Sequence, residues 1–242
     1  MASSTPPLPR LVVFDLDWTL WPLDVDTHVD APFSRDAATG AVRDRAGRAV
    51  RLFADTRRVL QWLHARGVPV AFASRTTDPD AAEQLLKAHL LFEGAAAAAG
   101  AGAGAATAAA GVGAGVGAGV GAGAGAGASP SPAAAAAAAS PLTMTLWDLL
   151  PSRAHFQAYP SGYGGSSGGG GGRAKTRHFA AILGAHGCAP EQVLFFDDAD
   201  DNVEVASAAG VTCVLLENGE GITFERFERG LAAFRDRKGP AR

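Results

Sequence analysis

The sequence predicts an α/β fold in which helices cover both faces of a mostly parallel central sheet. Short and wholly apolar runs, such as residues 11–14 and 193–196, are typical of strands buried on both faces. Segments with apolar residues at helical spacing lie between such runs, and this alternation favours right-handed crossovers between parallel strands. Both runs continue into a pair of acidic residues, and ligands in such sheets bind beyond the carboxyl ends of the strands. We therefore expect three layers and a ligand site at one edge of the sheet.

The amino-terminal part of the chain supplies the first two strands of this sheet. Its expected elements are, in order, a strand at 11–14, a polar loop at 24–36, a hairpin at 40–52, a helix at 55–66, a strand at 68–74 and a helix from about 79. The hairpin rests on loose alternation around an Ala46-Gly47 turn. Gly67 follows the first helix at the position where glycine commonly ends helices.

The carboxyl-terminal part repeats the alternation of strands and helices. Its expected elements are a short strand at 155–159, a helix from about 176 to 187, a strand at 193–198, a helix from about 202 to 209, a strand at 211–216 and a final helix. The final helix has the clearest buried face, since apolar residues recur at spacings of three and four: Phe224, Phe227, Leu231 and Phe234.

Two low-complexity segments interrupt this pattern. Residues 94–140 are almost wholly alanine and glycine without charge, and residues 161–174 are rich in glycine. Neither segment carries enough large apolar side chains to offset the entropy of ordering the chain, so we expect both to be disordered. The residues outside these two segments are enough to form one sheet covered by helices. We therefore expect a single domain over residues 1–242, interrupted by disordered insertions.

Composition excludes several classes of protein. The net charge is −3 and no basic block is present, which argues against a nucleic-acid partner. Cys188 and Cys213 provide no disulfide framework, which favours a reducing compartment. Residues 1–10 lack the apolar core of a secretory signal, and the alanine/glycine segment lacks the large apolar residues of a membrane span. We expect a cytoplasmic monomer without membrane contact.

Six polar side chains are expected at one edge of the sheet, where the carboxyl ends of parallel strands gather: Asp15, Asp17, Ser74, Lys175, Asp197 and Asp198. Asp15 and Asp17 begin on the same side of the backbone, and carboxylates so close repel each other unless a cation or a proton lies between them. If Asp15 and Asp17 are considered alone, the alternative to an active-site pair is two solvated acids in the turn at the end of a strand. Together the six suit Mg²⁺ and a phosphate, whose oxygens Ser74 and Lys175 would hold.

These residues resemble the motifs of haloacid-dehalogenase (HAD) superfamily phosphatases. Residues 15–19 (DLDWT) are similar to the DxDxT signature, and Ser74, Lys175 and the acidic pair at 197–198 match the second, third and fourth motifs in order. More narrowly, five segments resemble the magnesium-dependent phosphatase subfamily: VVFDLDWTLWPLDVDTHVDAPF (12–33), VRDRAG (42–47), ASRT (73–76), KTRHF (175–179) and FFDD (195–198). The resemblance implies a HAD-like Rossmannoid fold. Members of the superfamily often carry a cap after the first motif or between the second and third, but here residues 21–54 hold only a hairpin and the second gap is alanine/glycine repeat, so we expect no cap domain.

The resemblance also implies a mechanism. Asp15 would attack phosphorus and form an aspartyl-phosphate, and Asp17 would act as general acid and then as general base. Mg²⁺ would be bound by Asp15, by the backbone carbonyl of Asp17 and by the acidic pair. Within that pair we favour Asp198 as the direct ligand, with Asp197 binding through water or orienting the shell.

The resemblance implies further that Ser74, Arg75 and Lys175 bind the substrate phosphate. An open site would admit a protein phosphotyrosine as well as a phosphorylated sugar or sugar-amine, and the sequence does not choose between them. Two residues depart from the subfamily, since Trp18 stands where tyrosine is expected and Asp24 where a large aromatic residue is expected.

Two alternatives stay open, of which the first is from another functional class. A receiver-like or non-catalytic module that binds phosphate and Mg²⁺ also uses carboxylates, a hydroxyl and a lysine. A receiver domain is disfavoured because the acidic pair of its first strand precedes a separate phosphate-accepting aspartate, and its lysine follows on the last strand. The second alternative keeps the enzyme but gives the alanine/glycine segment a role in protein interaction.

Overall fold

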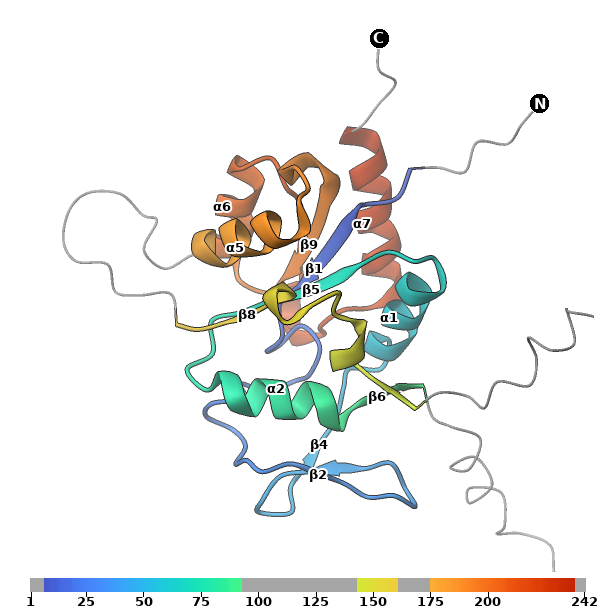
Figure 1. The fold of residues 1–242 in the computed structure, drawn as a ribbon, viewed down its shortest axis with the longest axis vertical. Helices are drawn as coiled ribbons and strands as arrows, with labels where there is room; N and C mark the ends of the chain where they lie inside the picture. Colours follow the sequence, from blue (N-terminus) through green and yellow to red (C-terminus); the bar gives the residue numbers. More distant parts are fainter. Residues whose placement is uncertain (1–6, 93–142, 161–174, 238–242) are drawn as a thin grey trace, which may run out of the picture.

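The computed structural model describes residues 7–92, 143–160 and 175–237, and its centre is a five-stranded parallel sheet (Figure 1). The strands follow the order β10-β9-β1-β5-β8. Their bounds are β1 (Leu11–Phe14), β5 (Val70–Ser74), β8 (Phe156–Ala158), β9 (Val193–Asp197) and β10 (Thr212–Leu215). All four neighbouring pairs are parallel, which confirms the predicted sheet.

Helices lie on both faces of this sheet. Their bounds are α1 (Thr56–Ala65), α2 (Pro79–Ala88), α5 (Thr176–His186), α6 (Asp200–Ala208) and α7 (Phe224–Arg237). Along β1 the side chains alternate between two buried clusters. Leu11 and Val13 pack in the cluster that α5 and α6 complete, whereas Val12 and Phe14 pack in the larger cluster that α1, α2 and α7 complete. The three-layer α/β architecture is therefore confirmed.

A small antiparallel sheet lies outside these layers, between β1 and α1 in the chain. It consists of β2 (Ser34–Arg35), β3 (Val42–Arg43) and β4 (Ala49–Val50). The predicted hairpin is β3 with β4, and Gly47 in its turn has φ of +81°, which glycine adopts readily. Strand β2 was not predicted, since two exposed residues carry no alternation. No cap domain is inserted among the described residues.

A second short pair joins two segments that are far apart in the sequence. Strand β6 (Leu90–Phe92) pairs antiparallel with β7 (Met144–Thr145), and Phe92 lies opposite Met144. The expected disorder of 94–140 and 161–174 lies outside the described residues. Short 3₁₀ turns complete the structure: Trp147–Leu149, Arg153–His155, Pro190–Gln192 and Glu217–Gly219. Within the described part of the chain, no helix combines the length and apolar character needed to cross a bilayer.

Candidate active site

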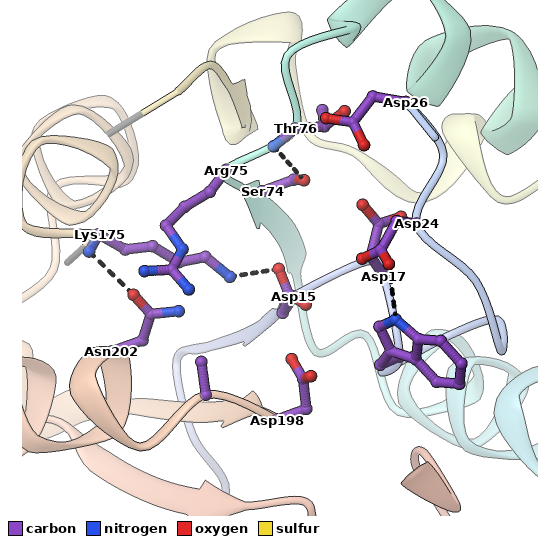
Figure 2. Close-up of a pocket in the computed structure, with 12 residues that line it drawn as sticks. Asp15, Asp17, Asp24, Asp26, Ser74, Arg75, Thr76, Lys175, Asp198 and Asn202 are labelled. Atoms are coloured by element: carbon purple, nitrogen blue, oxygen red, sulfur yellow. Dashed lines mark hydrogen bonds and ion pairs between the residues drawn. The ribbon is translucent and has the colours of Figure 1, made fainter. Parts of the chain in front are cut away.

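The end of β1 presents two acidic side chains to a cleft. The N–H of Asp15 still bonds to the carbonyl of Phe196 on β9 at 2.9 Å, so this residue continues the sheet. The chain then turns, with Trp18 at a φ of +54°. Asp15 and Asp17 both line the resulting cleft, whose volume is about 180 Å³ (Figure 2). The buried strand β1 and the tight turn after it together fix the carboxylates of Asp15 and Asp17, as the DLDWT pattern predicts.

Lys175 reaches this cleft from the start of α5. Its side chain is 2% exposed, and its Nζ forms ion pairs with Asp15 and with Asp197, the latter at 2.6 Å. Burial alone would lower the pKa of Lys175, but the two carboxylates outweigh burial and raise it above its usual value. The lysine is therefore held in its charged form between two acids that come from neighbouring strands.

Negative charge exceeds positive charge at the centre of the cleft. Burial raises the pKa of Asp15 well above its usual value, and Asp197 and Asp17 add to this rise while Lys175 opposes it. Burial also raises the pKa of Asp17 to about 7, against a hydrogen bond of 2.7 Å from the indole N–H of Trp21. An added cation would relieve this repulsion, because one ammonium group does not neutralise the carboxylates around it.

Three carboxylates are arranged so that one metal ion would fit among them. Asp15, Asp197 and Asp198 each offer an oxygen, and these oxygens lie within 4.8 Å of one another. Such a set of hard oxygen ligands suits Mg²⁺. Of the acidic pair, Asp198 is half-buried and lines the cleft, and burial together with Asp197 raises its pKa.

Asp197 has a different environment from its neighbour. It is fully buried, and its carboxylate accepts hydrogen bonds from the side-chain amide of Asn202 at 2.9 and 3.1 Å and from the N–H of Ala199 at 2.8 Å. Together with the ion pair to Lys175, these bonds hold both of its oxygens. This environment fits a group that orients the site, as the sequence interpretation proposed for Asp197.

The end of β5 brings a hydroxyl and a guanidinium to the same cleft. Ser74 is 1% exposed, and its Oγ accepts a hydrogen bond of 3.2 Å from the N–H of Thr76. The side chain of Arg75 lines the cleft and pairs with Asp201 at 2.8 Å. Figure 2 shows both residues beside Asp15 and Lys175. The structure therefore brings every residue of the predicted site together.

Sequence reasoning missed Asn202, which connects the third and fourth motifs. Asn202 is 2% exposed, and its Oδ1 accepts a hydrogen bond of 3.2 Å from the N–H of Lys175 while its amide binds Asp197. An asparagine in the first turn of a helix resembles a solvated surface residue. Only its position five residues after the strand-ending acid could have indicated a role.

Two further acids line the entrance to the cleft. The Oδ2 of Asp24 accepts a hydrogen bond of 3.1 Å from the indole N–H of Trp18, and it lies 3.4 Å from Nδ1 of His28. The Oδ2 of Asp26 accepts bonds from the N–H and hydroxyl of Thr77 at 2.9 and 2.8 Å. The two departures from the subfamily pattern, Trp18 and Asp24, thus contact each other at the rim.

Comparison with known proteins finds similarity to phosphatases and to a HAD-like hydrolase. The model of the acid phosphatase family matches residues 7–106 and 162–237. Human magnesium-dependent phosphatase 1 is 31% identical over 236 residues, which cover 97% of this chain and 93% of that protein. A HAD-like hydrolase superfamily protein of Schizosaccharomyces pombe is 44% identical over 79 residues, which cover 32% of this chain and 46% of that protein.

Proposed function

Since the chain belongs to the acid phosphatase family, with HAD-like relatives, we propose that it is a magnesium-dependent phosphatase that hydrolyses phosphomonoesters through an aspartyl-phosphate on Asp15. One observation carries this proposal. A buried lysine lies between Asp15 and Asp197, beside a second cleft-facing acid from each strand, Asp17 and Asp198. Such a set provides a nucleophile, an acid and positive charge at one place.

The first step transfers the phosphoryl group to the protein. A carboxylate oxygen of Asp15 forms a bond to phosphorus while the bond between phosphorus and the leaving oxygen breaks. Asp17 gives its proton to that leaving oxygen, so that an alcohol rather than an alkoxide departs. The position of Asp17, two residues after the nucleophile and in the same cleft, supports this role.

The second step returns the nucleophile to its starting state. The carboxylate of Asp17 takes a proton from water, and the water oxygen forms a bond to phosphorus. The bond between phosphorus and the Asp15 oxygen breaks, which releases inorganic phosphate. Asp17 is then protonated again and the cycle is complete.

Positive charge and hydrogen-bond donors hold the phosphoryl oxygens. We assign this role to Lys175, Ser74 and Arg75, which line the same cleft. Mg²⁺ would be held by Asp15, Asp198 and the backbone carbonyl of Asp17, with Asp197 orienting the shell. When bound, the ion supplies positive charge that offsets the charge of the phosphoryl group.

The substrate belongs to one of two classes, a protein phosphotyrosine or a phosphorylated sugar or sugar-amine. No cap domain covers the cleft among the described residues, and this openness supports both classes. A screen of phosphopeptides against sugar phosphates would separate them.

The direct test is hydrolysis of 4-nitrophenyl phosphate with and without Mg²⁺. We expect turnover that requires Mg²⁺ and falls by about 1,000-fold or more in Asp15→Asn, because an amide is no nucleophile. Asp80→Asn, which changes an exposed acid on α2, serves as the matched control and keeps full turnover. A folded, Mg²⁺-binding wild type without turnover would indicate the non-catalytic module instead.

A further inference from the structure

A second cavity lies between the small antiparallel sheet and the start of α1. Its volume is about 320 Å³, which exceeds the volume of the reaction cleft. Its walls come from β3, from β4 and the segment that leads into α1, and from His89 at the end of α2. Among the described residues, none lines both cavities. The second cavity is therefore separate from the proposed chemistry.

The lining of this cavity carries positive charge. Arg43, Arg51 and Arg57 line it, and the described lining residues include no aspartate or glutamate. Arg43 donates a hydrogen bond of 2.9 Å to the carbonyl of Gly47, and Nε of Arg57 donates one of 2.9 Å to the carbonyl of Leu90. These bonds hold two guanidinium groups in place although like charges repel. The reaction cleft, by contrast, is lined by five aspartates.

His89 adds a buried polar group to the same cavity. Its side chain is 5% exposed, and within the described part of the chain its Nε2 is buried without a hydrogen-bond partner. Buried polar atoms in proteins are nearly always hydrogen-bonded, so an orphaned one requires an explanation. The unpaired atom lies in a histidine that lines the cavity, so the packing at this wall leaves a polar group without a protein partner.

Two further features define the chemistry of the ligand. Ala54 and Arg57 line the cavity at the N-terminal end of α1, where the helix dipole adds positive potential. Leu52 and Phe53 are half-buried in the same wall and provide apolar surface. Guanidinium groups match the several oxygens of a phosphate better than a single point charge does.

We propose that this cavity is a second, non-catalytic binding site for a small organic phosphate, with its phosphate at Arg43, Arg51 and Arg57 and its apolar part against Leu52 and Phe53. The site is independent of the aspartyl-phosphate mechanism. Its occupancy is measured by binding, so the test does not depend on turnover.

The test is an NMR titration of the full chain with phenylphosphonate, whose carbon–phosphorus bond the proposed hydrolysis does not break. We expect backbone amide shifts at residues 40–43, 49–57 and 89, in addition to any shifts around the reaction cleft. Arg51→Glu reverses one charge in the cavity. We expect the affinity for phenylphosphonate, measured from the shifts at residues 40–43, 49–57 and 89, to fall by about tenfold or more. Any shifts around the reaction cleft keep their wild-type affinity in this variant.

Arg45→Glu is the matched control, because Arg45 is exposed at the tip of the same hairpin and does not line the cavity. It leaves both sets of shifts at wild-type affinity. Shifts confined to the reaction cleft, or equal weakening in both variants, would overturn the proposal. Equal binding of benzoate would overturn its phosphate chemistry. Well-dispersed spectra of Arg51→Glu establish that this variant is folded, and Arg43→Glu replaces it if they do not.

Discussion

Asp17 is held in the cleft through one of its two oxygens. Oδ1 accepts hydrogen bonds from the indole N–H of Trp21 at 2.7 Å and from the N–H of Val25 at 3.3 Å. Among the described residues, Oδ2 has no hydrogen-bond partner. In the proposed mechanism we therefore expect Oδ2 to be the oxygen that exchanges a proton with the leaving group and with water.

Asp17→Asn separates the two roles that we assign to this residue, general acid in the first step and general base in the second. Departure of 4-nitrophenolate needs no proton, so the initial burst of nitrophenol release persists while steady-state turnover falls by about 100-fold or more. With an alkyl phosphate, which needs a proton in the first step, the burst is lost as well. Rapid-mixing kinetics on both substrates measure this difference, and an equal loss of the burst on both would contradict the assignment.

His89 connects pH to stability. Burial, together with the charge of Arg57, lowers the pKa of His89 to about 3 from a usual value near 6.5. Well above pH 6.5 the histidine is neutral in both the folded and the unfolded protein, so it does not contribute to the pH dependence of the free energy of unfolding. As the pH falls below 6.5, the unfolded chain takes up the proton first, and the free energy of unfolding decreases by about 1.4 kcal/mol per pH unit.

His89→Leu removes this contribution, and urea unfolding between pH 7 and 5 measures it. The variant loses less stability than the wild type over that range, by about 2 kcal/mol at pH 5. Parallel slopes for the wild type and His89→Leu would show that His89 titrates normally in the folded protein.

At the scale of elements, α7 lies against the sheet through a glycine. A Cβ at Gly230 would lie 2.7 Å from Cζ of Phe196 and 3.0 Å from Cγ2 of Val214. We expect Gly230→Ala to destabilise the protein by about 1–3 kcal/mol, because the strands beneath it cannot move without disturbing the core. Gly184→Ala on α5 meets nothing within 4 Å and stabilises by about 0.5–1 kcal/mol.

Urea unfolding of the two glycine variants checks this contrast. Both substitutions place the same methyl group inside a helix, so any difference between them reports the packing against the sheet. Shifts of the same sign and size would mean that α7 does not pack as closely as described.

Elements with a continuous apolar run or a strong helical periodicity were the ones that the sequence predicted most clearly. The buried strands and the stripe of phenylalanines on the last helix met this condition, and all five central strands were found within a few residues. Strands β2, β6 and β7 have two or three residues each, too few to show alternation, and β6 and β7 form because two distant segments meet. Asn202 was missed for a similar reason, since its hydrogen bonds to Lys175 and Asp197 depend on tertiary contacts.

At the scale of the whole molecule, the β6–β7 pair brings together the points where the chain leaves and re-enters the described fold, since Phe92 lies opposite Met144. Residues 94–140 can therefore be deleted with residues 93 and 141–143 as the connection. The composition of the segment predicts disorder, so we expect its removal to lower the entropic cost of closing the chain and to stabilise the fold by about 1–2 kcal/mol.

Turnover and urea unfolding of the deletion variant test this expectation. We expect turnover of 4-nitrophenyl phosphate within about twofold of the wild type, because the described residues that line the cleft all lie outside the deleted segment. Loss of turnover in a folded deletion variant would show that the segment contributes to the site. Loss of a binding partner alone would support the interaction role.

The central claim is that Asp15 carries the phosphoryl group during turnover. The most direct measurement quenches the enzyme during steady-state hydrolysis, reduces the acyl phosphate with borohydride and identifies the modified peptide by mass spectrometry. The account predicts homoserine at position 15 in the presence of substrate and Mg²⁺, and none when either is omitted. Homoserine at another aspartate, or an unmodified chain in samples that trap a known aspartyl-phosphate enzyme, would contradict it.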